Sequence, residues 1–419
     1  MKSKELLPNL AKGSMVILIV ISLIKLLLHL YTNAFASYGI FRDELYYIAC
    51  SDRLAFGYVD QPPLSIFILF LSRLVLGESL FAIRLLPAIA ATMTVFITGL
   101  MVRKLGGGKI AVIIAASAVA LAPIQLGMNT VFSMNAFDIF FWALASYIVV
   151  LILKEGNQKL WILLGIILGL GLLNKISMIW FFVGFFVALL LTSHRRQLTR
   201  KWPWITGVLA FVLFSPFIIW NLSHDFAHIE FIRNASMYKY SGLTPLDFII
   251  GQLLLQNPAA LPVWIAGLWF FLFAKQGRHF RLLGIIYVVA FLILIINRTS
   301  KAEYLSPAYP MLFAAGAVFV ERLCRRKHWG WLKFAGPAFL IVSGLLLSPI
   351  ALPVLPVETY INYSNFLGIN PHTSEGKELV ELPQFYADMF GWENMAATVA
   401  EVYHLLPEDE QSKTVIFAR

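Results

Sequence analysis

The stretch FRDELYYIACSDRLAFGYVDQPPLS, residues 41–65, carries four carboxylates between two strongly apolar parts of the chain. Its acids are Asp43, Glu44, Asp52 and Asp60. The 419-residue chain is 59% hydrophobic and only 13% charged, and its mean hydropathy is +0.77. These values lie outside the range of ordinary soluble domains and are typical of a polytopic membrane protein. We therefore expect the stretch to be a loop at a membrane surface.

Eleven apolar segments are each near the length that crosses about 30 Å of hydrocarbon. The first, residues 15–32, contains Lys25, is long for a cleaved signal peptide and has no small-residue cleavage site close behind it, so it is expected to be a retained transmembrane helix. The run at 64–77 has 14 residues and contains Arg73, which predicts a juxtamembrane helix along the surface. The other ten spans are expected at 82–102, 110–127, 135–153, 160–173, 177–192, 204–220, 257–274, 282–297, 305–321 and 334–350.

The distribution of Lys and Arg predicts the orientation. If the run at 64–77 does not cross, one side of the membrane receives 20 Lys and Arg with three acids, and the other receives 12 basic residues with 20 acids. The positive-inside rule makes the basic side cytoplasmic, with the N-terminus on it. The net charge of +10 is then a topology signal and gives no reason to expect nucleic-acid binding. Polar residues gather on the outer side, where a site is expected.

The first outer loop is expected to begin with a short amphipathic helix over residues 42–56, ended by the glycine and the two prolines that follow. One stripe of this helix holds Leu45, Ile48 and Asp52, and Asp43 lies on the other side. Two interpretations remain open from composition alone. The acids either form a catalytic cluster or simply solvate an outer loop.

The second outer loop, within residues 221–256, holds two histidines and two acids within seven residues. His224 and His228 are spaced i, i+4, so on a helix they share a face and could bind a metal together with a carboxylate from elsewhere. Histidines that only form hydrogen bonds at the interface are the commoner case.

Four basic residues are expected near the outer membrane boundary: Arg84, Lys175, Arg298 and Lys301. Cations there can simply meet lipid phosphates. The alternative is a pocket for a phosphate or pyrophosphate carried by a membrane lipid. Asp138 lies near the outer end of the fourth span, where an acid usually has a partner or a function.

Seven short motifs occur along the chain in the order RDELYY, GYVDQPPL, AIRLLPA, NAFDIFFWAL, LLNKISMIW, SPFIIWNLSHDF and KAEYLSPAYPML. They resemble motifs of the GT-C glycosyltransferases, specifically the protein O-mannosyltransferase-like superfamily, and are similar to those of the aminoarabinose transferase that modifies lipid A. The resemblance covers residues 15–322. It implies an all-α polytopic GT-C fold with about eleven transmembrane helices. Family members take a sugar from a polyprenyl-phosphate carrier on the non-cytoplasmic face and pass it, with inversion, to an acceptor nucleophile.

The resemblance implies that Asp43 is the general base that deprotonates the acceptor hydroxyl, with Glu44 beside it. This fits the chemistry, because a hydroxyl that attacks an anomeric carbon needs a carboxylate, and a phosphate leaving group needs cations. Lys175 and Lys301 would hold the carrier phosphate, with Arg84 as a further ligand. Supporting side chains are expected at Tyr46, Asp138 and Tyr304.

Asp60 matches the position where aminoarabinose transferases have a Glu that takes part in metal binding. The resemblance therefore makes Asp60, with His224 or His228, a possible site for a divalent metal. Gln61 is a departure, because those enzymes have Lys there. One phosphate contact is then missing or supplied elsewhere, and the sugar need not be aminoarabinose.

The composition changes at about Ala351. Residues 1–350 are expected to form the transmembrane catalytic domain, and residues 351–419 a small outer α/β region with a helix at 392–406 and a strand in the closing KTVIFAR. Similar proteins continue into a larger soluble domain, so we expect this region to be incomplete.

Two other functions compete with glycosyl transfer. A lipid-linked sugar transporter or flippase would carry ionisable residues near the bilayer midplane, whereas the polar groups here crowd one face. A pyrophosphate-carrier oligosaccharide ligase is disfavoured, by resemblance, because of the long acidic first loop. We expect a multi-pass enzyme of a bacterial inner membrane with a periplasmic tail, using a polyprenyl-phosphate-sugar donor and a lipid, glycan or protein acceptor. The sequence does not determine the sugar, the acceptor or the oligomeric state.

Overall fold

The structure is a computed structural model that describes residues 2–36, 38–240, 243–369, 371 and 381–416, with side chains from residue 12 onward. All regular secondary structure in these residues is helical. The predicted strand at the end of the chain is wrong for residues 413–416, which follow a helix and have no strand to pair with in the part of the chain that the structure describes. The last three residues of that prediction lie outside the described part.

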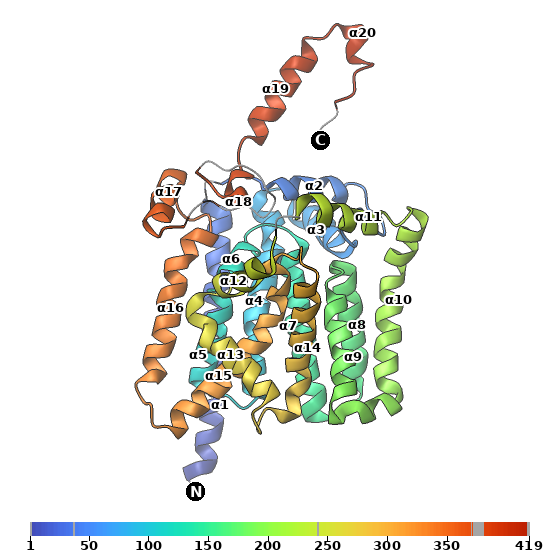
Figure 1. Cartoon of the computed structure of the whole chain (residues 1–419). Coiled ribbons are helices and arrows are strands. Elements are labelled where there is room, and N and C mark those ends of the chain that lie inside the picture. Colours follow the sequence, from blue (N-terminus) through green and yellow to red (C-terminus); the bar gives the residue numbers. More distant parts are fainter. Residues whose placement is uncertain (1, 37, 241–242, 370, 372–380, 417–419) are drawn as a thin grey trace.

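The body of the protein is a bundle of long helices (Figure 1). Each of the eleven predicted spans overlaps one long helix of this bundle, and the span predicted at 110–127 also includes a short second helix, Pro123–Gly127. By length and apolar composition, six helices in the described chain can cross a membrane, or eight if each of two bent helix pairs is one span. The multi-pass character is therefore confirmed, and the count of eleven stays a prediction. The helices are α1 (Lys2–Phe35), α4 (Leu80–Lys104), α5 (Lys109–Ala120), α7 (Met134–Glu155), α8 (Lys159–Asn174), α9 (Met178–Leu191), α10 (Lys201–Ser223), α13 (Leu261–Leu272), α14 (Arg281–Ile296), α15 (Tyr309–Arg326) and α16 (Leu332–Ala351).

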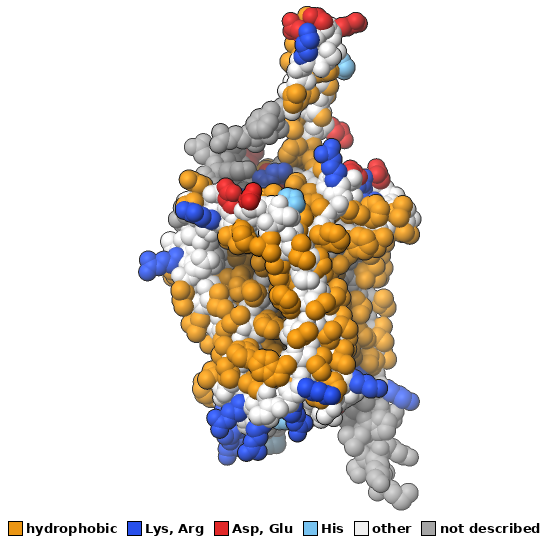
Figure 2. Space-filling view, turned by 90° about the vertical axis from the view of Figure 1, so that its right-hand side faces the viewer, with side chains coloured by type: hydrophobic (Ala, Val, Ile, Leu, Met, Phe, Trp, Pro, Cys, Tyr) orange, Lys and Arg blue, Asp and Glu red, His pale blue; other side chains and the backbone are white. Residues whose placement is uncertain are grey.

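The surface of the bundle matches a membrane environment. Figure 2 shows a broad hydrophobic band, with Lys and Arg gathered along its lower edge and Asp and Glu above it. Large apolar side chains such as Val208 and Phe211 on α10 and Phe339 on α16 are more than half exposed. Lipid rather than water is the solvent that suits such a surface.

The charged residue Lys25 occurs inside the first apolar span because it binds at a break between two other helices. Its ammonium group is fully buried and lies 3.1 Å from the carbonyl oxygen of Ala120 and 3.3 Å from that of Gln125. Ala120 ends α5, and Gln125 lies in the short helix α6 (Pro123–Gly127). The lysine in the first span thus satisfies carbonyl groups that the break leaves without helical partners.

One end of the bundle carries the short helices α2 (Arg42–Ser51), α3 (Leu64–Leu76) and α11 (Ala227–Asn234) (Figure 1). α2 ends before the predicted residue 56. The chain turns back at this point because the Tyr58 hydroxyl lies 3.2 Å from the carbonyl oxygen of Cys50, the residue before the helix end. α2 also buries Glu44, Tyr47, Cys50 and Ser51, so its protein-facing side is not the predicted apolar stripe.

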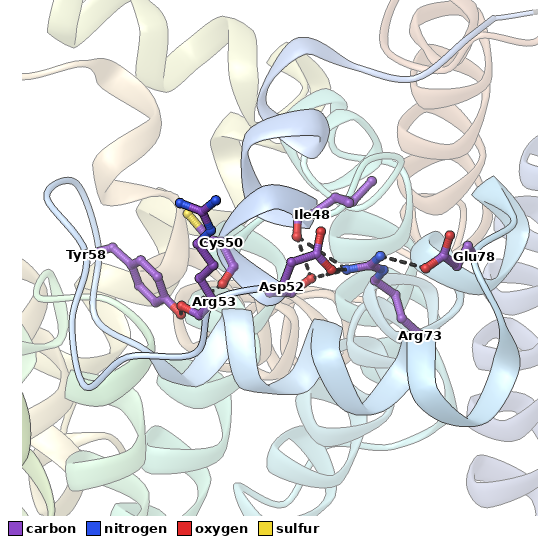
Figure 3. A network of polar contacts seen from close by, with 8 residues as sticks. Ile48, Cys50, Asp52, Arg53, Tyr58, Arg73 and Glu78 are labelled. Carbon is purple, nitrogen blue, oxygen red and sulfur yellow. Dashed lines mark hydrogen bonds and ion pairs between the residues drawn. The ribbon is translucent and has the colours of Figure 1, made fainter. Parts of the chain in front are cut away.

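α3 lies beside α2, as predicted for a surface helix, and Arg73 holds it there (Figure 3). The guanidinium of Arg73 is 2.6 Å from Asp52 Oδ1, 2.7 Å from Glu78 Oε1 and 2.6 Å from Ser51 Oγ. Asp52 therefore has a structural role. An arginine inside an apolar run keeps this run at the surface because its charge is paired there rather than in hydrocarbon.

The tail forms a second, small core with the loop that leads into α2. Its buried members are Tyr38, Val131, Tyr360, Tyr386 and Met389. The tail helices are α17 (Val357–Phe366), α18 (Gln384–Ala387), α19 (Trp392–His404) and α20 (Glu408–Gln411), of which α19 confirms the helix predicted at 392–406 and extends away from the bundle (Figure 1). The division of the chain at residue 350 into two domains stays a prediction.

Candidate active site

Glu44 is the best-satisfied acid of the loop between α1 and α4. It is fully buried and accepts hydrogen bonds from Arg84 Nε at 2.9 Å and Nη2 at 2.6 Å. The backbone N–H groups of Phe41, at 2.9 Å, and Phe132, at 2.7 Å, donate to the same carboxylate. Four donors occupy both oxygens, so Glu44 ties α2 to α4 and to the turn before α7. These contacts give Glu44 and Arg84 a positioning role, while the predicted catalytic role of Glu44 and the predicted phosphate contact of Arg84 stay predictions.

Asp43 precedes Glu44 on the first turn of α2 and points the other way. Its side chain is 42% exposed, and Oδ1 lies 3.1 Å from Arg42 Nε. Successive residues of a helix point about 100° apart, so an inward Glu44 requires an outward Asp43. The two acids of the RDELYY motif thus have different environments, and only Asp43 can meet a substrate.

Asp60 lies close to Asp43 in space. Tyr46 donates a hydrogen bond from its hydroxyl to Asp60 Oδ1 at 2.8 Å. Burial raises the pKa of Asp60 above its ordinary value, and the charge of Asp43 acts in the same direction, while the Tyr46 hydrogen bond and Lys239 oppose the shift. The pKa of Tyr46 is raised by burial and by the charge of Asp60. The structure therefore brings together Asp43, Tyr46 and Asp60, as predicted for one site.

The loop that carries Asp60 is docked on the end of α10. A Cβ atom added to Gly57 would come within 2.5 Å of the Trp220 ring and 2.9 Å of the Phe217 ring, so only glycine allows this approach. His228, on α11, places Nδ1 2.9 Å from the carbonyl oxygen of Val59. The position of Asp60 thus depends on α2, α10 and α11 together.

His228 has the form that a metal ligand requires. It is buried, burial lowers its pKa, and Nδ1–H can donate to the Val59 carbonyl, which leaves the Nε2 lone pair without a hydrogen-bond partner among the described residues. A histidine whose other nitrogen donates to a carbonyl is the usual arrangement of metal-bound imidazole. His224 differs, because it is exposed and stacks on Trp220 with ring centroids 4.2 Å apart. Among the described residues, no three His, Cys, Asp or Glu side chains form a metal-binding group.

Lys175, one of the predicted phosphate-binding cations, contacts other predicted site residues. It follows α8 and donates to Asn135 Oδ1 at 2.6 Å, lies 3.8 Å from Asp138 Oδ2, and sits 5.3 Å from the ring centroid of Tyr304. Asp138 is buried in α7 and accepts a hydrogen bond from Ser177 at 2.8 Å. The structure thus joins three predicted residues, Lys175, Asp138 and Tyr304, in one cluster.

Lys301 extends the basic region. Its ammonium group lies 4.8 Å from the ring centroid of Tyr240 and 3.6 Å from Glu303 Oε1, and Lys239 lies 5.7 Å from the same Tyr240 ring. Arg298 lies in the turn after α14 and is exposed. The contacts therefore place Lys301, rather than Arg298, on the aromatic groups of the site.

Tyr47 connects the carboxylates with the Lys175 cluster. Its hydroxyl lies 3.5 Å from the sulfur of Met134, the first residue of α7 and the neighbour of Asn135. Burial raises the pKa of Tyr47, and the charges of Asp43 and Asp60 add to that shift. Tyr47, which interacts with the two acids, and Lys175 therefore contact neighbouring residues, Met134 and Asn135, at the start of α7.

Comparison with known proteins supports the fold. The sequence model of the dolichyl-phosphate-mannose-protein mannosyltransferase family matches residues 60–220. The lipid A galacturonosyltransferase RgtD of Rhizobium johnstonii is 24% identical over 242 residues, which are 57% of this chain and 50% of the relative. The chain thus spans about half the length of that curated relative.

Two solved structures superpose on most of the chain. ArnT from Cupriavidus metallidurans bound to undecaprenyl phosphate matches with a TM-score of 0.65 and 17% identity over 86% of this chain and 70% of its own. The oligosaccharyltransferase of Archaeoglobus fulgidus tethered with an acceptor peptide matches with a TM-score of 0.58 and 14% identity over 97% of this chain and 59% of its own. The chain has the GT-C fold. The GT-C architecture expected from the motifs is confirmed.

Sequence reasoning missed several contacts of this candidate site. Arg42 and Ser177 bind proposed site residues directly, yet each is a common polar residue next to a more conspicuous one. Their motifs, RDELYY and LLNKISMIW, contain the signal, since both residues lie within two positions of a predicted site residue. Tyr240 carried no signal, because its contact with Lys301 joins two distant loops.

Proposed function

We propose that the protein is an integral membrane inverting glycosyltransferase that moves a sugar from a polyprenyl-phosphate donor to an acceptor hydroxyl or phosphate. The observation that carries this proposal is a series of contacts at the start of α7: Tyr47, whose pKa responds to the charges of Asp43 and Asp60, contacts Met134, and Lys175 binds the neighbouring Asn135. The resemblance to a lipid A galacturonosyltransferase and to ArnT bound to undecaprenyl phosphate supports a lipid-linked donor. A transporter would instead need its polar groups near the middle of the spans.

In this mechanism Asp43 accepts the proton of the acceptor hydroxyl, and the acceptor oxygen attacks the anomeric carbon. The bond between that carbon and the phosphate oxygen breaks from the opposite side, which inverts the configuration. The electron pair leaves with the phosphate, whose negative charge Lys175 and Lys301 stabilise. Glu44 and Arg84 hold α2 so that Asp43 faces the acceptor.

We also propose where a divalent metal would bind if the enzyme uses one. Asp60 and the Nε2 atom of His228 are the suitable ligands, and a cation there would add positive charge beside the phosphate. Metal content by elemental analysis of the purified protein tests this idea directly. Bound zinc or manganese that is lost in His228→Ala, and kept in His224→Ala, supports it, whereas unchanged metal content in His228→Ala contradicts it.

The proposed location is a bacterial inner membrane, with the N-terminus in the cytoplasm and the tail in the periplasm. The charge bias of the loops supports this orientation. Single cysteines introduced at exposed positions of the tail, such as Ser412, should react with a membrane-impermeant maleimide in spheroplasts. Labelling only after the membrane is broken would show that the tail lies in the cytoplasm, which contradicts the proposed orientation.

The activity can be tested with purified protein in lipid nanodiscs. A panel of undecaprenyl-phosphate-linked hexoses, amino sugars and uronic acids is offered with lipid A, glycan and peptide acceptors, and release of undecaprenyl phosphate is measured. We expect acceptor-dependent release with at least one donor. Movement of the intact donor between leaflets of a liposome without its consumption would favour a flippase, and consumption of only pyrophosphate-linked donors would favour the ligase.

A further inference from the structure

Residues 384–392 of the tail pack against the segment that leads into α2. The ring centroids of Tyr386 and Tyr38 are 5.1 Å apart, and those of Phe385 and Phe41 are 5.4 Å apart. A Cβ atom added to Gly39 would lie 2.6 Å from a backbone oxygen of this tail segment. The tail is therefore part of the surroundings of α2 and of the proposed base that α2 carries.

Arg42 is the residue through which the tail and the site meet. Its Nη1 atom lies 2.9 Å from Asp388 Oδ2, and its Nε atom lies 3.1 Å from Asp43 Oδ1. The backbone N–H of Arg42 also donates to the carbonyl oxygen of Asp388 at 3.1 Å. Trp392 Nε1 donates to the same carbonyl at 2.9 Å, which fixes Asp388 in turn. One guanidinium thus binds two carboxylates, one in the site and one in the tail.

We propose that Asp388 is a positioning residue for Asp43 that acts through Arg42; this proposal rests on the proposed function. A guanidinium is a planar fork that prefers to bind one carboxylate with two nitrogens. Asp388 holds one side of the fork, so Arg42 reaches Asp43 through Nε. Without Asp388, the fork can turn and take both oxygens of Asp43, and a carboxylate bound in this way is a poorer acceptor for the proton of a hydroxyl.

Asp388 and Asp43 compete for the Arg42 guanidinium, and partial burial strengthens the interaction of Arg42 with Asp388. The side chains of Arg42 and Asp388 are 28% and 18% exposed, so water screens their interaction less than it would screen a surface pair. Among the described residues, Asp60 and Tyr47 are the groups whose pKa responds to the charge of Asp43, and the Asp388 carboxylate contacts the side chains of Arg42 and Gln384. The effect of Asp388 should therefore pass through Arg42 alone.

A double-mutant cycle tests the proposal, with the active donor and acceptor found in the nanodisc panel. Asp388→Asn should lower kcat about tenfold and leave the KM for the donor within about twofold, because the base and not the phosphate site is affected. In an Arg42→Gln background, Asp388→Asn should have no further effect. Asp388→Glu should restore most of kcat. The matched control is Asp409→Asn in the distant helix α20, which should behave as wild type.

The rate of backbone hydrogen exchange in residues 38–44 distinguishes two roles of Asp388. It either positions Asp43, or it only holds the tail against the segment before α2. The proposal predicts unchanged exchange in Asp388→Asn. Faster exchange together with the loss of kcat would show that Asp388 only docks the tail, and an equal loss in the Arg42→Gln background would show that it does not act through Arg42. Full kcat in Asp388→Asn overturns this proposal alone, whereas absence of transfer by the wild-type protein overturns the proposed function with it.

Discussion

Glu44 and Arg84, which lie 40 residues apart in the chain, form a doubly hydrogen-bonded ion pair in the protein interior, with the shorter contact at 2.6 Å. The pair binds the loop after the first span to the second span. Because Glu44 is held inward by this contact and by two backbone N–H groups, its neighbour Asp43 is turned to the outside. The orientation of the proposed base is thus decided by a structural ion pair.

Glu44→Gln should destabilise the protein strongly. The variant leaves the Arg84 guanidinium buried without its counter-charge, and breaking one partner of such a pair costs about 3–5 kcal/mol. Thermal unfolding in detergent measures the loss. The matched control is Glu78→Gln, which breaks an ion pair with Arg73 at a 76% exposed carboxylate and should cost less than about 1 kcal/mol. Equal stability of the two variants would contradict the role assigned to Glu44.

Asp43→Asn should abolish sugar transfer without harming the fold. The amide keeps the size of the side chain but cannot accept the proton, so we expect kcat to fall by about 10²–10⁴-fold. Asp52→Asn is the control, because Asp52 is paired with Arg73 rather than with a proposed site residue, and this variant should retain transfer. Near-normal activity of Asp43→Asn, with membrane insertion intact, would remove Asp43 as the base.

Tyr46→Phe should move the acidic limb of the pH–activity profile to higher pH. Burial already raises the pKa of Asp60, and the Tyr46 hydroxyl opposes this by stabilising the charged form, as does Lys239, while Asp43 adds to the rise. Loss of the hydroxyl therefore raises the pKa of Asp60 further, so ionised Asp60 is reached at a higher pH. An acidic limb that does not move would show that ionised Asp60 is not needed for transfer, and Tyr31→Phe on the exposed side of α1 serves as control.

The raised pKa of Asp60 should also make the stability of the protein depend on pH. A carboxyl whose pKa is raised by folding binds its proton more tightly in the folded than in the unfolded state. Its contribution to stability therefore falls as pH rises from the ordinary value of 3.8 to the raised value. Tyr46→Phe should extend that fall to higher pH, whereas Asp60→Asn should remove it. Unfolding temperatures measured between pH 4 and 8 check both expectations.

Lys175→Met should weaken binding of undecaprenyl phosphate by about 10–100-fold, since a hydrogen bond to a charged group contributes roughly 1.5–3 kcal/mol. Titration of undecaprenyl phosphate against the intrinsic fluorescence of the protein in nanodiscs measures the affinity. Lys159→Met, at the opposite and exposed end of α8, is the matched control. Unchanged affinity for undecaprenyl phosphate in Lys175→Met would show that Lys175 does not bind the phosphate.

Lys25→Met should destabilise the bundle although methionine suits a transmembrane helix better. The carbonyl groups of Ala120 and Gln125 at the break between α5 and α6 both lose the lysine; Gln125 keeps a hydrogen bond from Asn129, whereas an unsatisfied buried carbonyl costs about 1–3 kcal/mol. Thermal unfolding in detergent again provides the measurement, with Lys201→Met at the exposed start of α10 as control. Greater stability of Lys25→Met would mean that the carbonyl groups find other partners.

The membrane spans and the fold class can be predicted from the sequence alone, because they depend on local properties of each segment. Apolar segments of sufficient length predict membrane spans, and short ordered motifs predict the GT-C fold, which the structural matches confirm. The surface position of residues 64–77 also follows from one arginine in a run too short to cross. Hydrophobic length and charge are properties of a segment by itself, and a segment keeps them wherever it packs.

Only the tertiary structure decided what each polar residue of the site does. Asp43 and Glu44 are adjacent acids on one helix, and nothing in their spacing says which faces inward. Arg84 settles this from another helix, as Asn135 and Tyr304 do for Lys175. The role of a buried charge depends on the partners that folding brings to it, because burial without them is too costly to persist.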